Sequence, residues 1–178
     1  MSKTVATPIV ETERLLIREL IESDADFVNQ LLNTPSFIQY IGDRGVRTDD
    51  DARAFIRERY QKSYEDHGYG LYAVELRDTG APIGMCGFVR REMLDGPDLG
   101  FAFLPEFEGQ GYGTESANAM LTFGHAVLNF ERVFAITSLD NAASIKLLEK
   151  IGFSLEGMIT PHEGEDLNLF SLDLPDRT

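Results

Sequence analysis

The chain has 178 residues, 43% of them hydrophobic, which is enough for one compact domain with a substantial core. Thirty Asp and Glu against sixteen Lys and Arg leave a formal net charge of −14. This charge repels nucleic acids and anionic membranes and suits a cationic or amine ligand, although it would also serve solubility alone. We therefore predict a single domain over residues 1–178, with neither a nucleic-acid partner nor a membrane partner.

Targeting, disulfide and metal-binding signals do not occur in the sequence. Residues 1–16 lack the apolar core of a secretory signal, and no run approaches a membrane span, so we expect a cytoplasmic protein. Cys86 is the single cysteine and lies among apolar residues, which predicts a buried side chain rather than a thiol nucleophile. His67, His125 and His162 form no metal-ligand spacing with it, so no metal is predicted.

The first third of the chain predicts one strand followed by two helices. Residues 14–20 carry a strand pattern, and Ser23 is placed to cap a helix that Pro35 closes. Thr48, followed by three aspartates, is a typical N-cap, and the helix that it opens ends near Gly68.

The middle of the chain predicts three antiparallel strands. Residues 72–76 and 83–89 flank a turn at 78–80 and indicate a β-hairpin. A third strand, 99–104, follows an acidic loop. We place the centre of the sheet in this region.

Gly109, Gly111 and Gly113 form a turn that leads from the third strand into a helix. They allow a ligand to approach the backbone closely, and the helix N-terminus that follows favours phosphate oxygens. A sharp turn without any ligand is the alternative. The dinucleotide fingerprint would need glycine at Thr114, and no G-x-x-x-x-G-K-[ST] loop occurs, so neither nucleotide fold is indicated.

The last third of the chain continues the alternation of helix and strand. Residues 132–138 predict a strand that a helical crossover makes parallel to the strand before it, with room between the two. Asn141 is placed to cap the next helix, and Gly152 to end it. A strand begins at Phe153, and residues 168–174 alternate as a final strand.

Several separated motifs in this order resemble the GNAT superfamily of N-acyltransferases over almost the whole chain. The acetyl-CoA motif of that family is Q/R-x-x-G-x-G/A, which residues 108–113 match except that Glu108 replaces the first residue. Residues 141–144 and 148–153 match the family's next helix. Similarity to the ribosomal-protein alanine (RimJ/RimL-like) branch lies at Glu13-Arg14-Leu15, Gly100, Thr114-Glu115 and Glu156-Gly157.

The resemblance implies an α/β fold of the α+β type, with a mixed central sheet that is largely antiparallel, contains one splayed parallel pair and is flanked by helices. It implies an N-acetyltransferase that transfers the acetyl group of acetyl-CoA to an amine by direct attack in a ternary complex. The implied acceptor is a protein N-terminal α-amino group, and the implied assembly is a monomer or homodimer. A small amine or polyamine acceptor and a non-catalytic acyl-CoA sensor are the alternatives.

The resemblance also implies roles for individual residues. The backbone of the strand would hold the pantetheine arm and direct an N–H at the thioester carbonyl, through Phe101, Ala102 and Phe103. The turn would hold the pyrophosphate, through Gly109, Gln110, Gly111, Tyr112, Gly113 and Thr114, and Asn141 would contact the CoA arm.

Proton transfer is the second group of implied roles. Many members of the family carry a tyrosine as the thiolate acid at the position of Leu148. The branch instead implies Ser144 as the acid and Glu163 as the base, with neighbouring His162 as an alternative base. Ser144 could equally serve only its own helical turn, and Glu163 could be a solvated charge.

Overall fold

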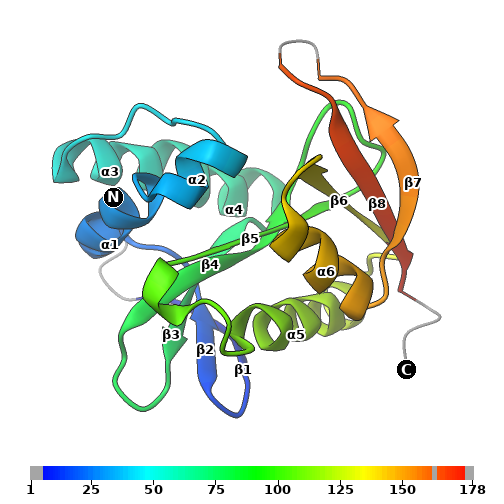
Figure 1. The fold of residues 1–178 in the computed structure, drawn as a ribbon. Coiled ribbons are helices and arrows are strands. Elements are labelled where there is room, and N and C mark those ends of the chain that lie inside the picture. Colours follow the sequence, from blue (N-terminus) through cyan, green and yellow to red (C-terminus); the bar gives the residue numbers. More distant parts are fainter. Residues whose placement is uncertain (1–5, 162–163, 175–178) are drawn as a thin grey trace.

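The computed structural model describes residues 6–161 and 164–174, and within them eight strands form one sheet in the order β1-β2-β3-β4-β5-β6-β8-β7 (Figure 1). All neighbours are antiparallel except β5 and β6, which are parallel. The strands are β1 Pro8–Glu11, β2 Leu15–Arg18, β3 Leu71–Leu76, β4 Pro82–Val89, β5 Asp98–Phe103, β6 Arg132–Ser138, β7 Ser154–Ile159 and β8 Leu167–Asp173.

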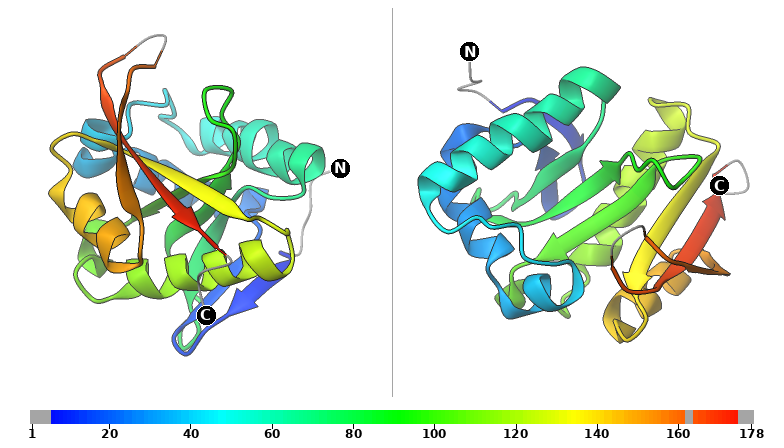
Figure 2. Two further views of the ribbon diagram at one scale, coloured as in Figure 1. Left: turned by 90° about the vertical axis from the view of Figure 1, so that its right-hand side faces the viewer. Right: turned by 90° about the horizontal axis from the view of Figure 1, so that it is seen from above.

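Six α-helices of the described chain flank this sheet in two layers (Figure 1). Helices α5 and α6 pack on one face, and α1 to α4 lie over the opposite face of β1 to β5 (Figure 2). The helices are α1 Ala25–Leu32, α2 Pro35–Tyr40, α3 Asp49–Phe55, α4 Lys62–His67, α5 Tyr112–Ala126 and α6 Ala142–Lys150. The architecture confirms the predicted mixed sheet with flanking helices.

Two apolar cores follow from these layers. Met120 and Leu121 of α5 and Leu148 of α6 belong to the first core, under β2 to β6 and β8. Val28 and Leu31 of α1 belong to the second core, which packs on the other face of β3 to β5. The helix periodicity of 3.6 residues puts one apolar stripe of each helix against the sheet.

The half of the sheet made of β6, β8 and β7 carries helices on one side only. Seen from above, α1 to α4 end over β5, and no helix of the described chain covers the upper side of β6 and β8 (Figure 2, right). Phe134, Ile136 and Leu169 share this side, because Phe134 pairs with Asp98 and Ile136 with Leu169. All three are only partly buried. We call this side of β6 and β8 the open face.

Strands β5 and β6 separate almost at once. Asp98 opposite Phe134 is the only register pair between them, whereas β4 and β5 share six and β6 and β8 share seven. The backbone of β5 beyond Asp98 therefore has no ladder partner on its β6 side within the described residues. The predicted splayed parallel pair is confirmed.

The N-terminal third differs most from the prediction. An additional edge strand, β1, pairs with β2. Asp24, not Ser23, is the N-cap residue of α1, and its carboxylate accepts a hydrogen bond from the Ile21 amide at 3.0 Å in the 3-10 turn that precedes the helix. Pro35 does not merely close α1 but opens α2, with Thr34 as the N-cap. Periodicity alone does not distinguish one broken helix from two.

The helix predicted after Thr48 is one continuous rod with a change of pitch in its middle. Thr48 forms a capping box with Asp51, and the rod ends at left-handed Gly68, as predicted. Residues Ile56–Gln61 between α3 and α4 form a π-helical segment, η2. Such segments are frequent at functional sites. The hairpin, the parallel strand, the Asn141 cap and the left-handed Gly152 all occur where the sequence places them.

Candidate functional site

The glycine-rich turn and helix α5 form the first part of the site. Pro105–Phe107 is a short 3-10 turn, η3, after which Gly109 and Gly111 adopt φ of 74° and 87°. Gly111 is the residue that caps α5, and its carbonyl accepts the first intrahelical bond from Glu115 at 3.0 Å. L-residues rarely adopt this conformation, so both positions require glycine. The turn consequently exposes backbone amides at the positive end of the α5 dipole.

Gly113 is glycine for a different reason, which is packing. A Cβ built on Gly113 would lie 2.7 Å from Cδ1 of Leu147 in α6. The missing side chain lets α6 approach the first turn of α5. Tyr112 and Thr114, on either side of Gly113, are half-buried, whereas Gln110 is exposed.

Arg14 brings a positive charge to this turn from the opposite end of the chain. Its Nη1 donates to the Gln110 carbonyl at 3.0 Å, and its guanidinium lies 4.3 Å from the centre of the Tyr112 ring. Its Nε donates to Oε1 of Glu115 at 2.7 Å. The sequence has no Lys or Arg between Arg91 and Arg132, so it is the fold that brings this cation to the turn.

The exposed edge of β5 forms the second part. The Leu104 amide donates to the Ile83 carbonyl of β4 at 2.9 Å, so even-numbered residues of β5 point their backbone groups at β4. By the same alternation Phe101 and Phe103 point theirs toward β6, from which the strand has separated. Ala102 turns its side chain to the α1 to α4 core instead. The strand thus presents free N–H and C=O groups beside the glycine turn.

Helix α6 provides Asn141 and Ser144. The Asn141 side chain accepts a hydrogen bond from the Ser144 amide at 3.3 Å and caps the helix. The Ser144 side chain is half-buried, and its hydroxyl forms no hydrogen bond within residues 6–161 and 164–174. Leu148 is 1% exposed in the first core. The contact of Leu147 with Gly113 joins this helix to the glycine turn.

Glu163 and the alternative base His162 lie outside the described residues. Their proposed roles therefore stay predictions from the sequence. Glu108 is exposed at the end of η3.

Asp98 is a buried carboxylate at the point where β5 and β6 part, and the sequence analysis did not single it out. The side chain is 2% exposed, and its Oδ2 accepts a hydrogen bond from Nε of Arg91 at 2.6 Å. Burial raises its pKa to about 6, against the opposing effects of Arg91 and of the Ile136 amide. Its Oδ1 has no hydrogen-bond partner among the described residues. A charged residue opening an apolar strand is the signal that could have identified it.

Cys86 is fully buried, as predicted, and burial raises the pKa of its thiol to about 12. A protonated, enclosed thiol is a poor nucleophile. Within the described ranges, no group of three or more His, Cys, Asp and Glu side chains is arranged to hold a metal ion. None of the described helices is long and apolar enough to cross a membrane.

Comparison with known proteins gives the same fold and a named domain. Residues 14–154 match the family described as "Acetyltransferase (GNAT) domain". The "Uncharacterized N-acetyltransferase YnaD" of Bacillus subtilis (strain 168) is 31% identical over 148 residues, which are 83% of this chain and 84% of that protein. The spermidine N(1)-acetyltransferase of Escherichia coli (strain K12) is 26% identical over 142 residues, 79% of this chain and 73% of that protein.

Comparison with solved structures also finds acetyltransferases. A GNAT-family acetyltransferase from Bacillus anthracis is 26% identical, with a TM-score of 0.78 over 93% of this chain and 98% of that one. The ribosomal-protein-S5-alanine acetyltransferase from Vibrio fischeri has the same TM-score of 0.78 over 98% of this chain and 99% of that one. Because the identity is 19%, this structural likeness shows a shared fold alone.

Proposed function

The chain belongs to the acetyltransferase (GNAT) family, whose members depend on acetyl-CoA, and we propose that it transfers the acetyl group to the α-amino group of a protein N-terminus. The observation that carries the proposal is the free edge of β5, which lies directly beside the glycine turn at the start of α5. A thioester on a pantetheine arm needs an extended backbone partner, and a pyrophosphate needs clustered N–H donors. The free edge of β5 supplies the extended backbone, and the glycine turn supplies the N–H donors.

In this proposal the amides from Gly109 to Thr114 bind the pyrophosphate at the positive end of α5. The N–H and C=O groups of Phe101 and Phe103 that face β6 pair with the pantetheine arm. One of these N–H groups donates to the thioester carbonyl and stabilises the oxyanion that forms on attack. Asn141, at the start of α6, contacts the CoA arm from the other side of the splay.

The chemical step is direct attack within a ternary complex. The lone pair of the neutral amine forms a bond to the thioester carbon, and the carbon–sulfur bond breaks with its electron pair on sulfur. The amine loses one proton and the thiolate gains one. Ser144 is our candidate acid for the thiolate, because its hydroxyl forms no hydrogen bond within the described residues. Leu148, at the position of the family's tyrosine, has no acidic proton to donate.

Two carboxylates are candidates for the base that deprotonates the acceptor ammonium. Glu163 is the prediction from sequence. Asp98 is a second candidate because it lies where β5 and β6 part and because one of its oxygens has no described donor. A carboxylate with a pKa near 6 is ionised at neutral pH and is a stronger base than an ordinary aspartate.

A polyamine acceptor is the second candidate function. The 26% identity to a spermidine N(1)-acetyltransferase and the net charge of −14 favour it. We retain the α-amino acceptor as the first proposal, since the similarity to the ribosomal-protein branch extends over separated motifs. A single domain, a cytoplasmic location and a monomeric or homodimeric assembly also stay predictions.

The test is thiol release from acetyl-CoA with a panel of acceptors, followed by mass spectrometry of the products. The panel contains short N-terminal peptides, peptides with a blocked α-amine and an internal lysine, and spermidine. We expect release with free α-amines and the acetyl group on the terminal nitrogen. Acetylation of spermidine alone would replace the first proposal with the second, and binding of acetyl-CoA without turnover on any acceptor would favour the sensor.

A further inference from the structure

The backbone amides of the glycine turn have no acceptor inside the protein. Among residues 6–161 and 164–174, no group accepts a hydrogen bond from the N–H groups of Gly109 to Thr114. The hydrogen bonding of α5 starts one residue later, where the Glu115 amide donates to the Gly111 carbonyl at 3.0 Å. These amides are therefore available to a ligand, and what each one contributes depends on the direction in which it points.

The peptide group between Gln110 and Gly111 decides the direction of one of these donors. A planar trans peptide places its C=O and its N–H on opposite sides, so the direction of the Gln110 carbonyl fixes that of the Gly111 N–H. Gly111 adopts a φ of 87°, but glycine adopts positive and negative φ about equally well. The glycine that makes this turn possible therefore does not by itself hold the peptide in one of its two directions.

Arg14 holds the carbonyl of this peptide from outside the turn. Its Nη1 donates to the Gln110 oxygen at 3.0 Å, so the Gly111 N–H points away from the guanidinium. Gln110 also donates from its Nε2 to the Glu106 carbonyl at 3.0 Å, but that bond involves the side chain and does not fix the peptide. The bond from Arg14 therefore selects the direction of the Gly111 amide.

The guanidinium of Arg14 is itself fixed by contacts from three sides. Its Nε donates to Oε1 of Glu115 at 2.7 Å, and its plane lies over the Tyr112 ring, 4.3 Å from the centre. The backbone of Arg14 donates to Oε2 of Glu115 at 3.0 Å and accepts from the Arg77 amide at 3.0 Å. Arg14 is thus the fixed partner of the bond, and the glycine peptide is the adjustable one.

A rotation of this peptide by half a turn would reverse the polarity that the turn presents. The Gln110 carbonyl oxygen would take the place of the Gly111 N–H, and its partial negative charge would face a bound phosphate. The neighbouring amides lie at the positive end of the α5 dipole, and the reversed peptide would oppose them. One hydrogen bond from Arg14 thus decides whether this peptide attracts or repels an anion.

We propose that Arg14 is a positioning residue for acetyl-CoA, whose bond to the Gln110 carbonyl directs the Gly111 N–H at the pyrophosphate. The inference rests on the proposed function, because it takes the glycine turn as the pyrophosphate site. Glu115 balances the charge of Arg14, so Arg14 acts through the peptide and not as a phosphate ligand. It contributes the direction of a donor rather than an additional cation.

The experiment uses variants that all keep the net charge of the wild type. Arg14→Lys retains the ion pair with Glu115 but gives up the bond to the carbonyl, because a single ammonium does not span the two acceptors as the guanidinium fork does. The double variant Arg14→Gln/Glu115→Gln removes one cation and one anion together. Both release the peptide between Gln110 and Gly111.

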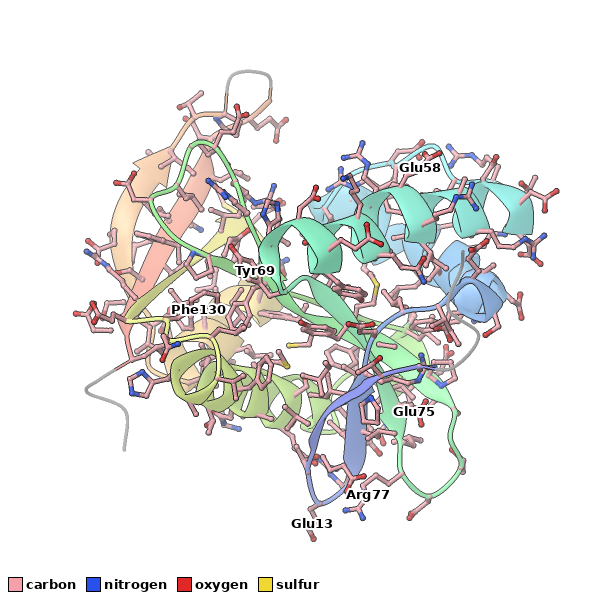
Figure 3. The ribbon with its side chains drawn as sticks, turned by 180° about the vertical axis from the view of Figure 1, so that it is seen from behind. Glu13, Glu58, Tyr69, Glu75, Arg77 and Phe130 are labelled. Atoms are coloured by element: carbon pink, nitrogen blue, oxygen red, sulfur yellow. The ribbon has the colours of Figure 1, made fainter. Side chains whose placement is uncertain are left out.

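Arg77→Lys is the matched control. Arg77 lies with Glu13 near the outer end of the β1–β2 turn (Figure 3), and its Nη1 donates to the Thr12 carbonyl at 2.8 Å. It forms no hydrogen bond to the glycine turn within the part of the chain that the structure describes. The control therefore makes the same exchange at a neighbouring arginine that also holds a carbonyl.

Binding is measured by calorimetry with CoA and with dephospho-CoA, which keeps the pyrophosphate and lacks the 3′-phosphate. We expect Arg14→Lys and the double variant to bind both ligands about tenfold more weakly than the wild type, because one hydrogen bond to a charged group is lost. Arg77→Lys should bind both as the wild type does. Circular dichroism establishes that each variant is folded.

A second measurement separates positioning from a merely structural role. In protein labelled with ¹⁵N-glycine, addition of CoA should shift the NMR resonance of the Gly111 amide in the wild type and in Arg77→Lys, since this N–H gains an anionic acceptor. The shift should be much smaller in the other two variants. If Arg14 served stability alone, the response of this resonance would be the same in all four proteins.

Wild-type affinity in either Arg14 variant, or a Gly111 shift that does not depend on Arg14, would overturn the proposal. A loss seen with CoA but not with dephospho-CoA would also overturn it, because it would place Arg14 at the 3′-phosphate. If the wild type does not bind CoA, this inference and the proposed function fail together. If CoA binds but no free α-amine is acetylated, the function alone fails, and the variants still decide the role of Arg14.

Discussion

Arg14 and Glu115 are 101 positions apart in the chain and form the ion pair that joins the β1–β2 turn to the first turn of α5. Nε of Arg14 lies 2.7 Å from Oε1 of Glu115, and the Arg14 amide donates to Oε2 at 3.0 Å. The Thr12 hydroxyl donates to the same oxygen at 2.5 Å. One carboxylate thus holds three donors from the turn at the point where the glycine segment enters its helix.

Glu115→Gln should therefore lower the free energy of unfolding by about 1 kcal/mol at neutral pH, because charged hydrogen bonds become neutral ones. Burial opposes ionisation of Glu115, but the hydrogen bonds from Thr12 and Arg14 prevail and lower its pKa below the ordinary 4.5. The stabilisation is then present above about pH 4.5 and lost as the pH falls through the lowered pKa. Urea unfolding of both proteins from pH 3 to 7 measures it, and a constant difference across this range would contradict it.

Gly111→Val should abolish acetyl-CoA binding. A valine side chain fills the space above the turn and resists the φ of 87°. Gly80→Val is the matched control, since Gly80 has a similar φ of 73° in the distant β3–β4 turn with open space around it. Calorimetry measures the acetyl-CoA affinity of both folded variants. Both carry the backbone strain, but only Gly111→Val blocks the proposed binding site. Normal affinity in Gly111→Val would place the cofactor elsewhere.

Glu108→Gln should tighten acetyl-CoA binding, because the exposed carboxylate lies beside the proposed pyrophosphate site. The gain should be on the order of 1 kcal/mol or less and should shrink with added salt. Glu131→Gln, a change at an exposed residue just before β6, should leave the affinity unchanged. Equal or weaker binding of Glu108→Gln at low salt would indicate a different role for this residue.

Ser144→Ala should lower kcat by roughly 100-fold with little change in the KM for acetyl-CoA, since a proton donor to the leaving thiolate acts only in the transition state. The Ser144 amide keeps its bond to Asn141 in this variant, so the helix cap stays intact. Steady-state kinetics with a saturating acceptor measures the effect. A wild-type kcat would remove Ser144 from the mechanism.

Asp98→Asn should change both the pH dependence of stability and that of catalysis. The pKa of Asp98 in the folded chain is raised to about 6, above its unfolded value of about 3.9, so the fold favours the protonated form. Wild-type stability should fall, relative to the variant, by on the order of 3 kcal/mol as the pH rises from about 4 to about 6, and remain level above that. Urea unfolding across this range tests the difference.

The catalytic counterpart decides between the two candidate bases. If Asp98 is the base, wild-type kcat/KM should fall below about pH 6, and Asp98→Asn should lose this limb and recover activity at high pH. Glu163→Gln should show that behaviour instead if Glu163 is the base. Unchanged pH profiles in both variants would leave amine positioning as the source of the rate.

Sequence by itself determined the features that depend on residues close together in the chain. The left-handed glycines, the Thr48 and Asn141 caps and the order of strands and helices follow from local conformational preference and periodicity, and so does the parallel crossover of β5 and β6. The family was identified instead by the resemblance of separated motifs to the GNAT pattern, one of which is the glycine turn at the head of α5.

Only the tertiary structure decided which distant side chains meet. Arg14 reaches the glycine turn because β1 and β2 lie beside the start of α5, and no local pattern records that contact. Asp98 is buried where β5 still pairs with Phe134 of β6 and where Arg91 contacts it. Residue type sets the charge that a side chain carries. Its neighbours and its access to water, which set its pKa and its possible role, arise only when the layers pack.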